Sequence, residues 1–325
     1  MPEISVVIPV YKVEDSIERC AVSLLEQTLD GIEFIFVDDG SPDRSVPVLQ
    51  SVVRRYPDRN VRILHMPCNS GLPEARLAGL LASSGDYVIG VDSDDWLSPE
   101  MLEKMYSCAI ATGADVVMCG WMADSPGGRS EARMPAHPSG REEFISGLLN
   151  GSIPGFVWNK LIRRTVLEPT PVTPAFNMAE DVVWSVQVVN RSSAFSFLDE
   201  PLYHYCLNPD SLTMSAGERQ SVERLRQNKG NLDLIFSYLS SEGLSGRYAT
   251  DILTAKYNVR RWIRHLIGRK EYYRMWKSTY PEVDRLFLRS AGVPARLKVS
   301  YLLALTKLEL LWRPVYRCLK LPKKC

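Results

Sequence analysis

The sequence lacks several features that would assign it to a specialised class. It has no apolar run of the roughly 20 residues that a membrane-spanning helix needs, and it opens with Met1-Pro2-Glu3 rather than with a signal peptide. Lys and Arg number 39 and Asp and Glu 38, so the net charge of +1 gives no basic excess for binding nucleic acid. The 7 cysteines show no CxxC or zinc-type pairing, and we expect free thiols in a reducing cytosol.

A glycine-rich phosphate loop is also missing. The apolar runs Ile4–Val10 and Phe34–Val37 are typical of buried strands, and a third strand is expected at Val61–His65. Helices are expected after these three strands, at about 14–27, 43–56 and 72–83. This alternation predicts a parallel, Rossmann-like α/β sheet. A dinucleotide-binding dehydrogenase would carry GxGxxG after the first strand, but this chain has Pro9-Val10-Tyr11-Lys12 there. Bound phosphates would therefore need a metal ion and basic side chains.

Tyr87–Trp96 (YVIGVDSDDW) is the most informative stretch of the chain. A short apolar run ends in three carboxylates within four residues, and two like charges about 4 Å apart repel by roughly 4 kcal/mol near the protein surface. A hard cation such as Mg²⁺ or Mn²⁺ would relieve this repulsion, and ligands of α/β sheets bind beyond the carboxyl ends of the strands. A helix cap and turn before Ser98-Pro99-Glu100 is equally compatible with these residues.

The rest of the chain adds more strands and then only helices. No internal repeat or low-complexity tract occurs. We expect strands at 116–119 and 195–198, helices at 100–113, 141–150 and 180–191, an exposed connection at 124–140, a turn-rich segment at 208–213, and helices from about 218 onward.

Five motifs occur in a specific order: VVIPVYK, FVDDGSPD, NSGLPEARLAG, GDYVIGVDSDDWL and AEDVVW. Together they resemble the family 2 glycosyltransferases, which have the GT-A fold, and the resemblance covers about residues 3–215. It implies a GT-A domain at 1–215, with a nucleotide-sugar half at about 1–119 and an acceptor half at about 120–215. A helical region, basic and rich in aromatic residues, would follow at 216–325.

The resemblance also implies the reaction. An inverting enzyme of the bacterial cell-surface polysaccharide type would move a hexosyl or N-acetylhexosaminyl group from a nucleotide-diphosphate sugar, for which a UDP-sugar is expected. The acceptor would be a hydroxyl of a glycan or of a lipid-linked glycan. Mn²⁺ or Mg²⁺ would assist by stabilising the charge that develops on the diphosphate leaving group.

The family pattern assigns the donor site to the loops after the first, second and fourth strands. Asp94 would be the metal ligand and Asp92 would face the ribose, with Ser93 beside them. Asp95 would be a supporting residue or a helix cap. The nucleobase would be bound by Asp39 in preference to Asp38, stacked on Tyr11 and shaped by Pro9, although a turn cap at 38–39 and simple packing of Tyr11 explain the same residues.

Four further residues are assigned by the same resemblance. Arg76 would face the donor diphosphate, and Lys160 would contact phosphate or acceptor. Glu180-Asp181 resembles the family's acidic pair, with Asp181 as the general base for the acceptor hydroxyl. The helix that begins there is expected to lower the pKa of Asp181 and keep it ionised. Acidic residues are common in the first turn of helices, which is an alternative explanation of Glu180 and Asp181. Trp184, one turn later, is expected to pack in the core.

The C-terminal third carries basic residues interleaved with Tyr and Trp between Thr254 and Lys277, and again after Arg296. This pattern suits peripheral binding to an anionic membrane surface. We therefore expect a cytoplasmic protein bound at the inner face of the cell membrane. A solvated basic face or a dimer contact would produce the same composition.

Two other classes of protein stay open on the sequence. A non-catalytic protein that binds nucleotide sugars or polysaccharide could keep the fold, although its acidic motifs would then have no catalytic use. A nucleotidyltransferase would release pyrophosphate from a nucleoside triphosphate, but its glycine-rich basic loop is replaced here by PVYK.

Overall fold

The computed structural model describes residues 2–125, 127–128, 130–207 and 217–307. The chain divides into two compact units. The first comprises residues 1–148 and 153–215, and the second comprises residues 149–152 and 216–325. The turn predicted at 208–213 and the part of the basic tail beyond residue 307 lie outside the described residues.

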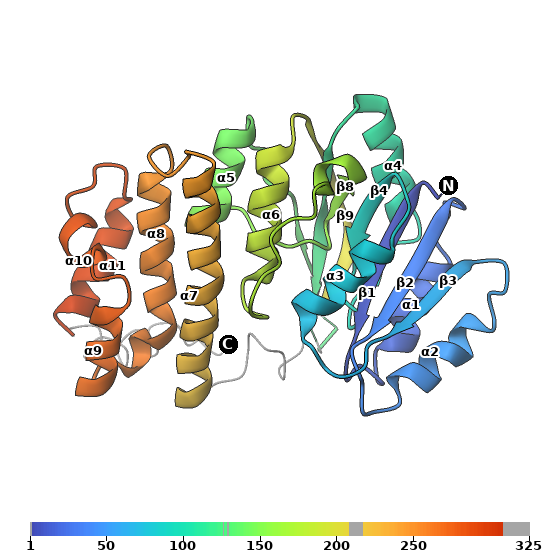
Figure 1. Ribbon diagram of the computed structural model, residues 1–325, viewed down its shortest axis with the longest axis horizontal. Coiled ribbons are helices and arrows are strands. Elements are labelled where there is room, and N and C mark those ends of the chain that lie inside the picture. Colours follow the sequence, from blue (N-terminus) through green and yellow to red (C-terminus); the bar gives the residue numbers. More distant parts are fainter. Residues whose placement is uncertain (1, 126, 129, 208–216, 308–325) are drawn as a thin grey trace, which may run out of the picture. The chain divides into compact units, whose positions relative to one another are not determined.

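Four parallel strands form one half of the sheet in the first unit (Figure 1). Their order is β3-β2-β1-β4, and consecutive strands are joined by helices, so the predicted α/β fold is confirmed. Strand β1 has its predicted bounds, whereas β2 is longer than predicted because its flanking residues also pair with β1. The strands are β1 (Ile4–Val10), β2 (Ile32–Asp38), β3 (Asn60–His65) and β4 (Tyr87–Gly90).

The other half of the sheet is mixed. Beyond β4 the order continues β8-β6-β9-β5, with β7 pairing to β6. Strands β8 and β6 are antiparallel to each other, whereas β6 and β9 are parallel. The strands are β5 (Trp96–Leu97), β6 (Val116–Asp124), β7 (Ser130–Arg133), β8 (Lys160–Arg163) and β9 (Phe195–Cys206).

Strand β9 is much longer than the predicted 195–198. Asp199-Glu200-Pro201 favours a turn, but an irregularity in the β6–β9 register on either side of Gly120 accommodates these residues without ending the strand. A Cβ at Gly120 would lie 2.7 Å from the Arg133 carbonyl oxygen and 3.0 Å from that of Glu200, so only glycine fits. The strand therefore reaches Cys206, which lines the cavity described below.

Helices cover both faces of the sheet because the strand residues alternate. Val6 and Ile8 face a core built with three helices, whereas Val7 faces the opposite side. The first face packs against α1 (Ile17–Leu25), α2 (Ser45–Val53) and α4 (Met101–Thr112). The opposite face packs against α3 (Leu72–Ala82), α6 (Glu180–Arg191) and the 3₁₀ helix η1 (Arg164–Leu167). Helix α5 (Arg141–Asn150) matches its predicted range.

The parallel strands bring three loops to one edge of the sheet. In the register, Val10 of β1 lies beside Asp38 of β2, and Val7 lies beside Gly90 of β4. The residues that follow these strands are therefore neighbours in space although they are distant in sequence.

The second unit is entirely helical in the residues that the structure describes. Its helices are α7 (Glu218–Ser241), α8 (Ala249–Arg260), η2 (Arg261–Leu266), α9 (Lys270–Ser278), α10 (Val283–Leu286) and α11 (Ala295–Leu305). None of the described helices in either unit combines the length and the apolar character that crossing a bilayer requires.

Several basic and aromatic residues of this unit are internal, which corrects the expectation that the segment 254–277 presents them outward. Arg260 is fully buried, stacks 4.9 Å over the Trp276 ring and pairs with Asp284 at 2.7 Å. Tyr257 is fully buried and packs against Phe287. These residues hold the helices together, because a buried charge needs a partner and hydrogen bonds.

Candidate active site

A cavity of about 1120 Å³ opens where the three loops meet. The structure brings together six of the predicted donor-site residues on its wall: Pro9, Tyr11, Asp39, Asp92, Ser93 and Asp94. The other six predicted residues are not part of this lining: Asp38, Arg76, Asp95, Lys160, Glu180 and Asp181.

Asp39 lines the cavity and holds a neighbouring turn in place. Its side chain is 3% exposed, and its two oxygens accept hydrogen bonds from the backbone N–H groups of Ser70 (2.7 Å) and Gly71 (2.9 Å). Gly71 has a positive φ of 94°, and a Cβ there would lie 2.9 Å from Oδ1 of Asn177. Asp39 thus anchors the Asn69-Ser70-Gly71 turn beside the cavity. Each of its carboxylate oxygens has a second lone pair that can accept a hydrogen bond from a ligand.

Asp38 has a different role from its neighbour. Its carboxylate accepts from the Ser41 N–H at 2.9 Å and contacts His65 Nδ1 at 2.9 Å. The structure therefore places Asp38 in the turn that starts the following connection, away from the cavity wall. Tyr11, in contrast, is 39% exposed and belongs to that wall.

Asp92, Ser93 and Asp94 line the same cavity. Burial, reinforced by the neighbouring Asp92 carboxylate, raises the pKa of Asp94 to about 6. No group of three His, Cys, Asp or Glu side chains gathers as a metal cage anywhere in the described part of the chain. The carboxylates of Asp92 and Asp94 nevertheless fit Mg²⁺ or Mn²⁺, which are commonly held by one or two carboxylates and completed by substrate phosphates and water.

Asp95 connects the acidic loop, residues 92–94, to strand β9. It is fully buried and accepts hydrogen bonds from the Tyr203 hydroxyl and from the Cys206 N–H, both at 2.7 Å. The Tyr203 hydroxyl also accepts from the Asp92 N–H at 3.2 Å. Asp95 therefore attaches the loop to strand β9 and is held away from any ligand.

Arg76 bridges two carboxylates instead of facing the cavity. Its Nη2 donates to Asp92 Oδ1 at 2.5 Å, and its Nη1 donates to Glu180 Oε1. The arginine is 7% exposed and the glutamate 5%, so this link is buried. It ties α3, the acidic loop and the start of α6 together, which corrects the expectation that Arg76 points at a diphosphate.

Asp181 follows Glu180 in the first turn of α6 and is half-buried. Its Oδ1 accepts from the Val182 N–H at 2.9 Å. Burial raises the pKa of Asp181, against the lowering effects of Arg76 and Lys160. The expectation of a lowered pKa at this helix start is therefore wrong, because desolvation outweighs the helix dipole. A carboxylate whose pKa is raised is a stronger proton acceptor when it is ionised.

Lys160 does not reach the cavity. It is 1% exposed, and its Nζ donates to the carbonyl oxygens of Pro154 (3.2 Å) and Phe156 (2.5 Å) and to Asn159 Oδ1 (3.1 Å). Burial lowers the pKa of Lys160 to about 7, against the raising effect of Asp181. Lys160 therefore lies close enough to Asp181 for the two groups to interact electrostatically, and the structure does not place it for the predicted phosphate contact.

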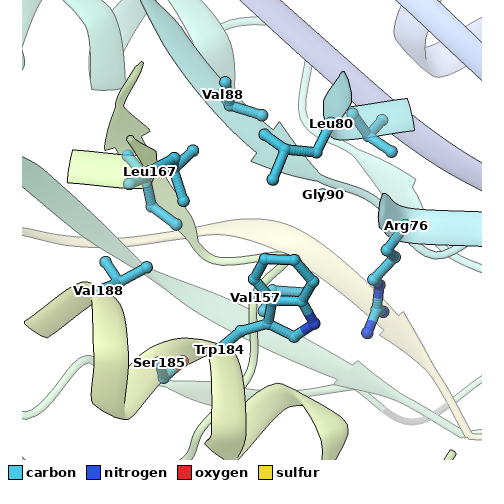
Figure 2. A pocket seen from close by; sticks show the side chains of 11 residues that line it. Arg76, Leu80, Val88, Gly90, Val157, Leu167, Trp184, Ser185 and Val188 are labelled. Atoms are coloured by element: carbon cyan, nitrogen blue, oxygen red, sulfur yellow. The ribbon is translucent and has the colours of Figure 1, made fainter. Parts of the chain in front are cut away.

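A second, smaller cavity of about 60 Å³ lies between the sheet and helices α3 and α6 (Figure 2). Its wall is mostly apolar, with Val88, Leu80 and Val157 among the lining residues. Trp184 is 6% exposed in this part of the core, as expected, and Figure 2 shows its indole nitrogen on the side of the ring that faces Arg76. Neither that nitrogen nor Arg76 Nε has a hydrogen-bond partner among the described residues.

Sequence reasoning missed several residues of the large cavity. Arg19 and Lys12 line it from α1 and from the loop before α1, Asn177 from the loop before α6, and 205–207 from the end of β9. Lys12 directly follows the predicted Tyr11, which was a usable signal. Arg19 occupies an ordinary exposed helix position, and nothing in its local sequence distinguishes it.

Comparison with known proteins adds a family to this geometry. The sequence model of "Glycosyl transferase family 2" matches residues 5–175, more than half of the chain. Among curated proteins, the uncharacterized glycosyltransferase EpsJ of Bacillus subtilis is 34% identical over 221 residues. That match covers 66% of this chain and 63% of EpsJ, so the chain spans less than two thirds of that relative's length.

Two solved structures share the fold. S. aureus TarS 1–349 in complex with UDP-GlcNAc has a TM-score of 0.56 at 19% identity, covering 82% of this chain and 83% of TarS. The mannosyltransferase PcManGT from Pyrobaculum calidifontis, in complex with GDP-Man and Mn²⁺, has a TM-score of 0.53 at 14% identity, covering 86% and 84%. At these identities the similarity establishes the fold alone.

Proposed function

Because this chain belongs to glycosyl transferase family 2, we propose that it is an inverting glycosyltransferase using a nucleotide-diphosphate sugar, expected to be a UDP-sugar. A hexosyl or N-acetylhexosaminyl group would pass to a hydroxyl of a glycan or lipid-linked glycan. The observation that carries the proposal is one cavity whose wall includes Asp39, Asp92 and Asp94. The complexes of TarS with UDP-GlcNAc and of PcManGT with GDP-Man and Mn²⁺ support a donor of this class.

The donor would lie along this cavity. Asp39 would accept an N–H from the edge of the nucleobase, with Tyr11 stacked on its face. Asp92 would contact the ribose, and Asp94 would hold Mn²⁺ or Mg²⁺. When bound, such an ion stabilises negative charge on the diphosphate as a Lewis acid. Pro9 and Ser93 would shape the cavity wall.

The acceptor would be activated by Asp181. An ionised carboxylate can take the proton of a hydroxyl as that hydroxyl attacks the anomeric carbon from the face opposite the diphosphate. The C–O bond to the acceptor forms as the bond to the diphosphate breaks, and the configuration at the anomeric carbon inverts. Glu180, fixed by Arg76, would hold the first turn of α6 in place for this step.

A thermal-shift screen tests the donor assignment. We expect UDP with Mn²⁺ to raise the melting temperature by about 5 °C or more at a hundredfold excess over Kd, because such binding adds about 2.7 kcal/mol. ADP and GDP are expected to give no comparable shift. Asp94→Asn should remove the part of the shift that depends on Mn²⁺, whereas Asp58→Asn, an exposed control, should keep it. If none of the nucleotides raises the melting temperature, the result would favour a non-catalytic protein that merely retains the fold.

We also propose that the helical unit binds the inner face of the cell membrane peripherally. Support comes from α10, α11 and their connection, where Leu286, Leu288, Val299 and Leu302 are 36–56% exposed. Exposed arginines accompany them at positions 285, 289 and 296. Apolar side chains beside cations suit an anionic lipid surface.

Vesicle sedimentation of the full chain tests this membrane proposal. Vesicles with 30% phosphatidylserine should retain the protein, and neutral phosphatidylcholine vesicles should not. Replacing Arg285, Arg289 and Arg296 by Gln is expected to weaken retention by up to about 100-fold, since each cation contributes at most about 1 kcal/mol. The matched control is Arg54→Gln with Arg55→Gln in the first unit. Equal retention by both vesicle types would contradict the proposal.

A further inference from the structure

The large cavity carries far more negative than positive charge. Only two side-chain cations, Lys12 and Arg19, belong to its described lining. Six carboxylates share the same wall: Glu14, Asp15, Asp39, Asp43, Asp92 and Asp94. A nucleoside diphosphate would add further negative charge, so it needs a cation within reach in addition to any metal ion.

Arg76 does not supply that cation on this wall. Both ends of its guanidinium are taken by Asp92 and Glu180, and the cavity that Arg76 lines is the smaller, mostly apolar one. Moving Arg76 toward a ligand would leave Glu180, which is 4% exposed, as a buried charge without its counter-ion.

Within the described residues, the contacts of Lys12 are with its neighbour Tyr11 and with Ser41, and none joins it to Asp92 or Asp94. Its Nζ sits 5.3 Å from the centroid of the Tyr11 ring, and its backbone N–H donates to Ser41 Oγ at 2.8 Å. Lys12 is therefore associated with the loop after β1.

Arg19 lies beside the acidic loop formed by Asp92, Ser93 and Asp94. One group of its guanidinium, Nη2, donates to the backbone carbonyl of Asp94 at 3.1 Å and lies 3.0 Å from Cys206 Sγ. Its Nε and Nη1 groups make no hydrogen bond to the described residues, and the side chain is exposed on the cavity wall. Three N–H donors thus remain available beside the proposed metal ligand.

We propose that Arg19 binds the diphosphate of the donor and of the product nucleotide. This inference rests on the proposed function and names the protein cation of that same site. The planar guanidinium suits phosphate oxygens because it offers two parallel N–H donors. The bond to the Asp94 carbonyl fixes the guanidinium beside the acidic loop, so the diphosphate would be held between Arg19 and the ion on Asp94.

Calorimetric titration of the full chain with UDP and with UMP, in Mn²⁺, tests the proposal. Arg19→Gln is expected to weaken UDP binding by about 10- to 100-fold, the effect of losing a charge-assisted hydrogen bond. UMP lacks the β-phosphate, so its affinity should change markedly less. Arg19→Lys keeps the charge but not the two parallel N–H donors, so it should bind UDP more tightly than Arg19→Gln and less tightly than wild type. The matched control, Arg55→Gln, removes a half-exposed arginine paired with Glu18 at 3.0 Å and should leave both affinities unchanged.

The outcomes separate the two proposals. If wild-type protein binds UDP and Arg19→Gln binds it equally well, the role of Arg19 is wrong and the proposed function stands. Equal weakening of UDP and UMP would show that Arg19 only supports the acidic loop. If wild-type protein binds neither UDP nor GDP, the proposed function fails and this inference fails with it.

Discussion

Replacing Asp181 by asparagine is expected to lower the rate of sugar transfer by about 10²- to 10⁴-fold, the usual contribution of a general base. The two side chains have nearly the same size, but the amide cannot accept the proton of the attacking hydroxyl. Asp181 is not part of the lining of the donor cavity, so UDP affinity should stay within about threefold of wild type. The measurement is UDP release from the UDP-sugar chosen by the thermal screen, together with UDP titration.

The pH dependence gives this prediction a second readout. Because burial raises the pKa of Asp181 above its ordinary value of 3.8, the ionised, active form is lost as the pH falls through that raised pKa. Wild-type kcat should therefore decline on the acidic side, and this decline should be absent from the residual activity of Asp181→Asn. Asp199→Asn, a change at an exposed carboxylate paired with His137, is the matched control. Wild-type turnover by Asp181→Asn would show that another group is the base.

The largest effect on stability is expected from Arg76→Met. The substitution keeps much of the side-chain volume but removes the counter-ion of Glu180 and Asp92, which are 5% and 28% exposed. Removing one partner of a buried ion pair typically costs about 3–5 kcal/mol, because the other charge stays buried and unpaired. Urea unfolding of the full chain, followed by circular dichroism, measures the loss.

Two further variants separate lost charge pairing from lost packing. Adding Glu180→Gln to Arg76→Met neutralises the buried carboxylate and should restore at least about 1 kcal/mol. Arg62→Met, at a half-exposed arginine 4.0 Å from Glu33, should change stability by less than about 1 kcal/mol. A loss below about 1 kcal/mol for Arg76→Met would mean that the bridge contributes little.

The sequence allowed the parallel half of the fold to be predicted because its signals are local. Apolar runs such as Ile4–Val10 end in Pro, Asp or Gly, and parallel strands must deliver their carboxyl ends to one edge. The placement of Asp92 and Asp94 at a ligand site followed from that rule, whereas Asp39, which lines the same cavity, was assigned by the family resemblance. Their roles in binding came from the family resemblance and remain predictions.

The parts that were not predicted depend on distant contacts. Arg76 pairs with Glu180, which lies 104 positions later, and no periodicity along either helix indicates that link. Lys160 is buried because three oxygen acceptors from the chain around it surround its ammonium group. The pKa of Asp181 depends on how deeply α6 is packed, which a sequence pattern does not give. Strand β9 continued past a turn-like segment because its partner has a glycine at the irregular position.

The bridge from Arg76 to Asp92 and Glu180 also limits how this chain can be re-engineered. Helix α6 is an obvious boundary when part of this fold is exchanged for that of a relative. Any transplanted helix without an acid at position 180 would leave the buried guanidinium of Arg76 without one of its two counter-ions. The segments that carry α3 and α6 therefore cannot be combined as independent modules unless positions 76 and 180 are transferred together.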